Sequence, residues 1–222
     1  MEYTVSNLII EGSRSIVEDF HSHPFVKGIA NGTLPVEKFK FFMIQDYLYL
    51  LDYARVFSIG AAKTSNPQMM KTFSGYVSSI LSGEMDIHKS YMKKLGIDTN
   101  EVENTKMSQD NLSYTSYMLR KAYEGGPAEV CAAILPCAVS YELIGRKMVK
   151  ENPLCAEHRF FGEWIKGYSG NEYHDENIKL MELTENAAEG YSQKQLEGLV
   201  EIGRRCSLYE GLFWDMSWEM RR

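Results

Sequence analysis

The sequence predicts a single all-α domain. Apolar residues recur at the three- and four-residue spacing of helices through most of the 222 residues, and glycine and proline gather at a few points between these segments. No segment shows the alternating pattern of a strand between turn residues, and no internal repeat or change of composition marks a second domain. Residues 1–222 are therefore expected to fold around one helical core.

Three long helices are expected in the first half of the chain. The first covers residues 3–21 and ends before Pro24, because a residue that precedes proline disfavours the α conformation. The second covers residues 35–64, and Pro35 lies where a first-turn proline is favoured. The third covers residues 66–96 and ends at a glycine, a common helix C-terminal signal.

The second half begins with a polar segment, residues 98–109, which has no clear periodicity and is expected to be a connector. A short helix over 113–123 follows and is closed by Gly125 and Gly126. A strongly apolar helix then covers residues 127–150 and contains Pro136. The remaining predicted helices cover residues 154–168, 171–189 and 193–219.

Composition excludes several classes of protein. The net charge of −6 and the absence of a basic stripe argue against a nucleic-acid partner. No apolar run approaches the roughly 20 residues of a membrane span, and no N-terminal apolar segment resembles a signal peptide. We therefore expect a cytoplasmic protein with free thiols. The four cysteines form no CxxC pair and are Cys131, Cys137, Cys155 and Cys206.

Cys137 is the first candidate for chemistry. It follows Pro136 inside a predicted helix, where proline removes a backbone hydrogen bond, and Tyr141 lies one turn further along the same face. A cysteine is nucleophilic only as the thiolate, so it needs a polar or electropositive neighbour. The alternative is a buried cysteine in a core helix, since free cysteines prefer burial.

Two acidic residues lie on aromatic helix faces. Asp46 is in a largely apolar run and shares its stripe with Tyr49, and Glu210 shares a face with Phe213. If these faces are buried, each carboxyl must find a partner or change its pKa, and a raised pKa suits a general acid. The alternatives are an Asp on the wet edge of its helix and a snorkelling or capping Glu.

Histidines raise two further possibilities. Glu84 and His88 are four residues apart and could bind a metal, but the di-iron motif needs Glu-x-x-His on two helices and no second copy exists. A supporting hydrogen-bond pair or a surface pair is the other interpretation. His21 or His23 could ligate haem, or could be an ordinary histidine at a helix terminus.

Several motifs in order along the chain resemble the TenA family (thiaminase II, aminopyrimidine aminohydrolase). They are His23-Pro24-Phe25-Val26-x-Gly28-Ile29-x-x-Gly32-Thr33-Leu34-Pro35, Gln45-Asp46-x-x-Tyr49-Leu50, Ser113-Tyr114-Thr115-Ser116, Leu135-Pro136-Cys137 and Tyr209-Glu210-x-x-Phe213-Trp214-x-Met216. The resemblance implies a haem-oxygenase-like helical bundle without haem or another cofactor, without a metal, and assembled as a homotetramer.

The same resemblance implies roles for individual residues. Cys137 would add to the pyrimidine ring, Glu210 would exchange a proton with a ring nitrogen, and Asp46 would hold the ring's amidine edge. The aromatic residues that would line or close the substrate pocket are Tyr49, Tyr114, Tyr141, Tyr168 and Phe213. Because the chain has Cys137, it resembles the cysteine-bearing branch of the family.

The function that follows is hydrolysis of thiamin or its aminomethylpyrimidine breakdown products to hydroxymethylpyrimidine. Two other classes stay open at this point. One is a haem-dependent or cofactor-free oxidoreductase on the same bundle, which would not need Cys137. The other is a non-catalytic pyrimidine-binding protein, which would bind the ring without turnover.

Overall fold

The computed structural model describes residues 4–222, except for the side chains at positions 83, 84, 86, 87, 99 and 103. The described chain is helical and contains no strand, so the predicted all-α class is confirmed. Its elements are α1 (Thr4–Phe20), α2 (Pro24–Ala30), α3 (Val36–Lys63), α4 (Pro67–Ser79), the π-helical segment η1 (Ile80–Glu84), α5 (Met85–Leu95), α6 (Thr99–Asn104), α7 (Gln109–Glu124), α8 (Pro127–Glu151), the 3₁₀ turn η2 (Pro153–Glu157), α9 (Gly162–Ser169), α10 (Asn171–Ala187) and α11 (Gln193–Glu219).

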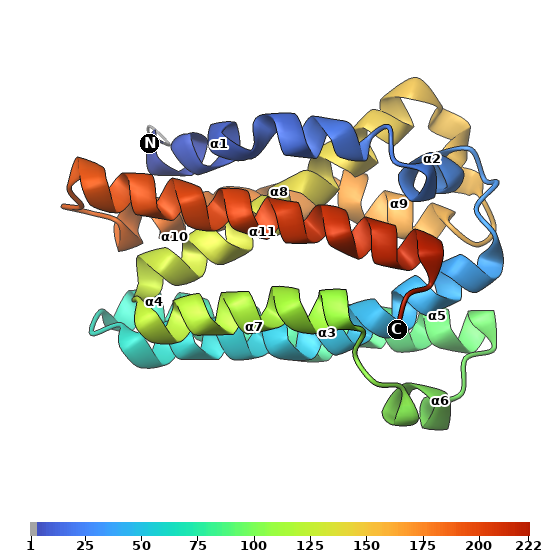
Figure 1. Ribbon diagram of the computed structural model, residues 1–222, viewed down its shortest axis with the longest axis horizontal. Coiled ribbons are helices and arrows are strands. Elements are labelled where there is room, and N and C mark those ends of the chain that lie inside the picture. Colours follow the sequence, from blue (N-terminus) through green and yellow to red (C-terminus); the bar gives the residue numbers. More distant parts are fainter. Residues whose placement is uncertain (1–3) are drawn as a thin grey trace.

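The long helices pack in two layers that α8 connects. Helices α3, α4, α5 and α7 lie together on one side, and α1 and α11 lie together on the other (Figure 1). Helix α8 begins beside the end of α7 and crosses obliquely toward α9, contacting α1, α3, α7, α9, α10 and α11 (Figure 1). It therefore lies at the centre of the molecule, where residues of several helices can meet.

The apolar character of α8 follows from this central place. By length and composition alone α8 is long and apolar enough to cross a membrane, contrary to the expectation that no such run exists. However, 78% of its most apolar window is buried inside the bundle. Packing against other helices thus accounts for the composition of α8.

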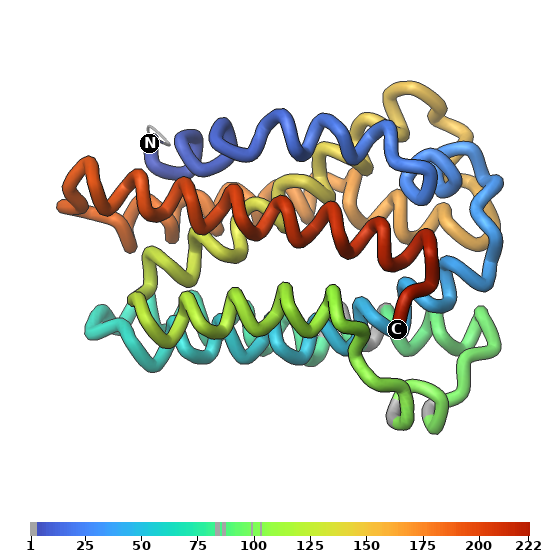
Figure 2. The backbone as a smooth tube through the Cα atoms, in the orientation of Figure 1, coloured from blue at the N-terminus to red at the C-terminus, as the bar shows by residue number. Residues whose placement is uncertain are grey.

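One helix was not predicted, and three local predictions were wrong. Residues 24–30 form a helix, because Pro24 begins it and the His23 side chain caps it by accepting a hydrogen bond from the Phe25 N–H, 3.2 Å away. The expected connector contains α6, which Asp98 caps and which projects from the bundle (Figure 2). Helix α7 begins at Gln109 rather than residue 113, because Ser108 caps it. Residues 154–168 divide into η2 and α9.

The predicted helix over 66–96 is also interrupted. Between α4 and α5 the backbone adopts π-helical hydrogen bonding over Ile80–Glu84. A π segment holds more residues per turn than an α-helix and is frequent at functional sites. It rotates the side chains of α5 about the helix axis relative to those of α4.

Candidate active site

The side chains of Cys137, Asp46 and Glu210 meet in the centre of the bundle. They come from α8, α3 and α11, three helices that contact one another. Asp46 and Glu210 are buried, with 5% and 2% of their surfaces exposed, whereas Cys137 is half-buried. The Cys137 thiol interacts with the Glu210 carboxyl, and the charge of Asp46 acts on both groups. The structure thus brings the three predicted catalytic residues together.

The Glu210 carboxyl has an altered acidity. Burial, with a contribution from the charge of Asp46, raises the pKa of Glu210 from 4.5 to about 7. Hydrogen bonding from Tyr141, Tyr114 and Cys137 favours the carboxylate and opposes this change. The Tyr114 hydroxyl makes no hydrogen bond of normal geometry to the described residues, yet it lies close enough to stabilise a charge on Glu210. A carboxyl that titrates near neutrality can both give and take a proton.

The pKa of the Cys137 thiol is raised, which disfavours a preformed thiolate. Burial and the negative charge of Glu210 raise the pKa of Cys137 well above its ordinary value, and the Tyr49 hydroxyl only partly opposes them. A nucleophilic cysteine was expected to have a polar or electropositive neighbour that favours the thiolate, whereas the neighbours of Cys137 are the Tyr49 hydroxyl and two acids. The thiol therefore keeps its proton until an acceptor takes it, and Glu210 is the acceptor that contacts it.

Aromatic rings surround these three groups. Tyr49 packs against Tyr114 at 5.2 Å and against Phe213 at 5.9 Å between ring centroids, and Tyr141 packs against Tyr168 at 4.8 Å. All are buried except Tyr168, which is half-buried. Phe42 and Trp214 connect the two sets of rings, because Phe42 packs against Phe213 and Trp214, and Trp214 packs against Tyr141. The five predicted pocket residues thus belong to one aromatic cluster, whose flat faces suit a planar heterocycle.

A glycine explains how Tyr168 reaches this cluster. Gly145 is one turn after Tyr141 on α8, and a Cβ atom there would lie 3.0 Å from the backbone of Tyr168 and Ser169. Any larger residue would push α9 away from α8. The missing side chain lets the two helices approach until Tyr168 stacks on Tyr141.

A cavity of about 350 Å³ adjoins the site. His88 and Tyr168 line it, and each contacts a residue of the site: His88 bonds Asp46, and Tyr168 stacks on Tyr141. The remaining lining residues are Met43, Ser90, Tyr91, Glu163, Trp164, Gly167 and Tyr173. The volume is enough for a small organic molecule.

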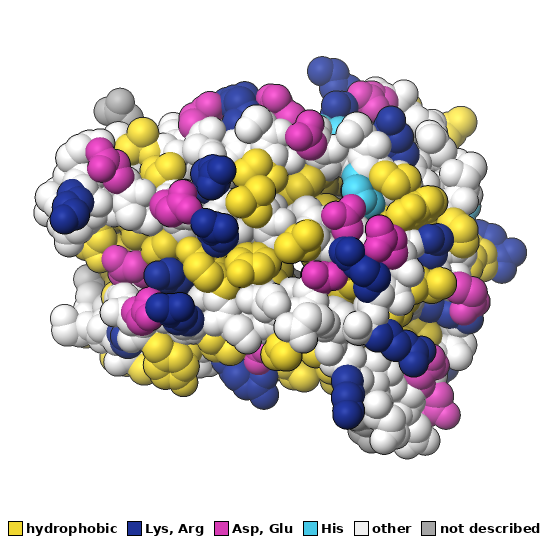
Figure 3. All heavy atoms as spheres, viewed as in Figure 1, with side chains coloured by type: hydrophobic (Ala, Val, Ile, Leu, Met, Phe, Trp, Pro, Cys, Tyr) yellow, Lys and Arg dark blue, Asp and Glu magenta, His cyan; other side chains and the backbone are white. Residues whose placement is uncertain are grey.

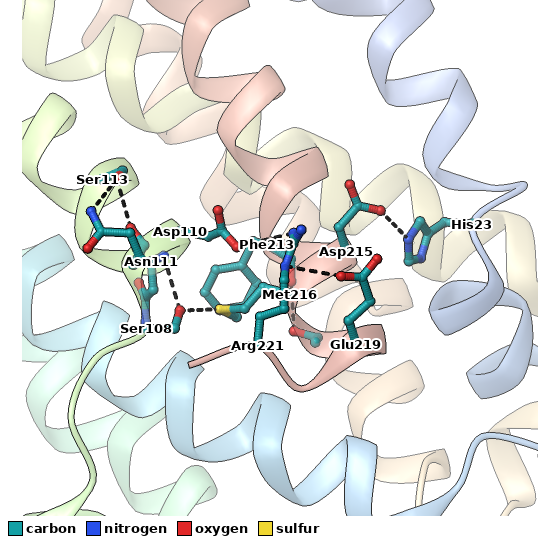
Figure 4. Close-up of polar contacts among 12 residues, drawn as sticks. His23, Ser108, Asp110, Asn111, Ser113, Phe213, Asp215, Met216, Glu219 and Arg221 are labelled. Atoms are coloured by element: carbon teal, nitrogen blue, oxygen red, sulfur yellow. Dashed lines mark hydrogen bonds and ion pairs between the residues drawn. The ribbon is translucent and has the colours of Figure 1, made fainter.

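Polar contacts join the start of α7 to the C-terminal end of α11 (Figure 4). The Ser108 hydroxyl contacts the Met216 sulfur, and the Arg221 guanidinium pairs with Asp110 at 3.1 Å. These contacts join the first turn of α7 to the last turns of α11. They fix the two helices that carry Tyr114 and Phe213.

His23 contacts two protein groups with its ring. Both ring nitrogens of His23 bind protein groups, since Nδ1 accepts from the Phe25 N–H and Nε2 lies 3.2 Å from Asp215. The side chain of Glu84 lies outside the described residues, so its predicted pairing with His88 is not described. Within the described residues, no three His, Cys, Asp or Glu side chains converge in a way that could hold a metal ion.

Sequence reasoning missed one part of the site. His88 Nε2 lies 2.6 Å from Asp46 Oδ2, although the sequence analysis considered His88 only together with Glu84. The contact of Trp214 with Tyr141, which joins α11 to α8, was also missed. Helical spacing relates residues on one helix, so it gave no signal for these two contacts between helices. Trp164 lies one turn before Tyr168 on α9 and packs against it, and here helical spacing could have indicated the contact.

The fold and the site define an all-α bundle that buries a thiol and two acids among aromatic rings. The TENA/THI-4/PQQC family model matches residues 12–220, and the chain belongs to this family. The chain is 42% identical to an aminopyrimidine aminohydrolase of Helicobacter pylori, over 97% of this chain and 99% of the relative. It is also 42% identical to an aminopyrimidine aminohydrolase of Halalkalibacterium halodurans, over 96% and 95% of the two chains.

Solved structures give the same result for the fold. A TenA homologue from P. horikoshii OT3 superposes with a TM-score of 0.86 at 28% identity, covering 97% of this chain and 98% of that one. The family that the sequence motifs resembled is therefore confirmed.

Proposed function

We propose that this protein is a thiamin-salvage hydrolase that converts thiamin or an aminomethylpyrimidine derived from it to hydroxymethylpyrimidine. The observation that carries this proposal is the contact between Cys137 and Glu210 beneath aromatic rings, with a Glu210 pKa of about 7. The two relatives named aminopyrimidine aminohydrolase, each matched over nearly its full length, support the same substrate class.

The first step is addition of the thiol across a C=N bond of the ring. Sγ of Cys137 bonds to a ring carbon, its proton passes to Glu210, and Glu210 delivers a proton to the ring nitrogen. No net charge is created, which suits a buried site where a free thiolate is disfavoured. Asp46 holds the exocyclic amino group of the ring, which is a hydrogen-bond donor.

The second step uses the electrons of the dearomatised ring. Their return toward the exocyclic methylene expels the amine or thiazole substituent with its bonding pair. The ring N–H gives its proton back to Glu210, which passes it to a leaving amine. Water then adds to the methylene, and departure of Cys137 restores the aromatic ring. Glu210 exchanges protons in both directions, which a pKa near neutrality allows.

The test is steady-state kinetics on thiamin and on the aminomethylpyrimidine with the wild type, Cys137→Ala and Glu210→Gln. We expect both substitutions to lower kcat by roughly 10²- to 10⁴-fold, because each removes a group needed for the same addition. The buried Cys206→Ala variant is the control and should retain turnover. Normal turnover by Cys137→Ala would overturn the proposed chemistry, and pyrimidine binding without turnover by the wild type would favour a binding protein.

We further propose a cytoplasmic homotetramer. Several large apolar side chains are exposed, among them Leu208 and Leu212 on α11 and Leu112 on α7. Hydrophobic side chains form a band along these two helices (Figure 3). Contiguous apolar surface of this kind is typical of protein interfaces.

A further inference from the structure

Asp46 and His88 form a buried pair that joins two helices. Nε2 of His88 on α5 lies 2.6 Å from Oδ2 of Asp46 on α3, and each residue is 5% exposed. An ionised carboxylate can only accept hydrogen bonds, so Nε2 carries the hydrogen and donates it. The contact with Asp46 thus determines which ring nitrogen of His88 carries the hydrogen.

The pair lies at the boundary of the site. His88 lines the 350 Å³ cavity, and the charge of Asp46 acts on Cys137, Glu210 and Tyr141. Burying a carboxylate and an imidazole costs desolvation energy that their attraction often only offsets. A pair placed here therefore has a better explanation in the site than in the stability of the fold.

One carboxylate has room for several hydrogen bonds. Each oxygen of Asp46 offers two lone-pair directions, and His88 occupies one direction on Oδ2. Within the part of the chain that the structure describes, Oδ1 accepts no side-chain hydrogen bond, so it can accept one from a donor of the ligand. A side chain with two rotatable bonds binds a ligand more tightly when it is already held in the bound orientation.

We propose that His88 is a positioning residue for aminopyrimidine binding: it holds Oδ2 of Asp46 so that the rest of the carboxylate is directed to the ring's amino group. This inference rests on the proposed function. His88 acts through Asp46 and does not itself take part in the addition of Cys137. Its removal should therefore weaken ligand binding more than it slows the bound reaction.

The test measures binding of hydroxymethyl aminopyrimidine by calorimetry, and KM and kcat, in single and double variants. His88→Ala should raise Kd and KM roughly tenfold to a hundredfold, the range of a charge-assisted hydrogen bond, with a smaller change in kcat. His88→Gln should recover most of this loss, since its terminal amide nitrogen can reach the position of Nε2. His88→Asn is too short and should not recover it.

The double variant decides whether His88 acts through Asp46. Asp46→Asn alone should weaken binding, and adding His88→Ala to it should weaken binding little further, because the two residues form one unit. If the two substitutions instead weaken binding independently, so that their fold-changes in Kd multiply, the inference is overturned. Equal binding by His88→Ala and the wild type would also overturn it while leaving the proposed function intact.

His174→Asn is the matched control. His174 Nδ1 lies 2.7 Å from Glu142 Oε1, but the His174 ring is half-exposed, and the buried Glu142 keeps its bonds from Asn177 and Arg146. The substitution should leave Kd, KM and kcat unchanged. Wild-type protein that neither binds nor converts aminopyrimidines would overturn the proposed function and this inference together.

Discussion

Glu210 shows how burial converts an ordinary side chain into a group that titrates near neutral pH. It is 2% exposed, and it faces another acid, Asp46, and a thiol rather than a cation. Burial and the negative charge of Glu210 likewise raise the pKa of Cys137. At neutral pH Cys137 is therefore held as the thiol, whereas Glu210 is divided between its neutral and charged forms and can take up or give up a proton.

This acidity predicts a dependence of stability on pH. The pKa of Glu210 is raised from 4.5 to about 7, so the stability that its neutral form contributes is complete below pH 4.5 and is lost as the pH rises through 7. The side chain of the Glu210→Gln variant does not ionise, so its contribution to stability does not fall as the pH rises. Relative to the wild type, the variant should gain stability between pH 5 and pH 8, by about 3 kcal/mol at most.

Urea unfolding at several pH values measures this gain. The exposed Glu197 lies on the same helix, and Glu197→Gln should follow the pH dependence of the wild type. A pH-independent difference between Glu210→Gln and the wild type would contradict the assignment of a raised pKa to this carboxyl.

At the scale of the elements, the contact of α11 with α8 depends on one glycine. A Cβ at Gly203 would lie 2.5 Å from the Ile9 side chain and 3.2 Å from Pro136. Pro136 is the residue before Cys137, so this contact holds α1 and α11 against the part of α8 that carries the thiol. Proline and glycine face each other where the helices are closest.

Gly203→Ala should therefore destabilise the protein by about 1–3 kcal/mol, because the added methyl group overfills a packed interface. Gly198→Ala, on the same helix with open space around its Cα, should instead stabilise by up to about 1 kcal/mol through helix propensity. Denaturation midpoints measure both effects. Equal effects of the two substitutions would contradict the packing explanation.

The elements also show what a sequence can predict. Helix spacing and punctuation located the long helices, and short motifs selected Cys137, Asp46 and Glu210 as candidates, which the structure places together. Capping by His23 and Asp98 was missed, because the proline and the polar composition nearby suggested a break. The bond between His88 and Asp46 depends on how α5 packs on α3, and no local pattern encodes that arrangement.

At the scale of the whole molecule, exposed leucines on α11 and α7 lead to a prediction about assembly. We expect a mass in solution of about four times the 25.5 kDa of the chain, measured by light scattering after gel filtration. Leu208→Glu combined with Leu212→Glu should lower this mass, because charges at an apolar interface lose hydration on association.

Glu201→Gln, on a polar part of α11, is the control and should keep the wild-type mass. A monomer at micromolar concentration for the wild type would contradict the homotetramer. An unchanged mass for the double variant would instead place the interface on another face.

The π-helical segment Ile80–Glu84 sets the direction in which the side chains of α5 point. Each extra residue in a helical turn advances every later side chain by about 100° around the axis. His88 comes four residues after this segment. Its imidazole therefore points at Asp46 only when α5 has its present rotation about the helix axis. Deleting one residue of the π-helical segment would turn the imidazole away from Asp46 while leaving the hydrophobic packing of α4 in place.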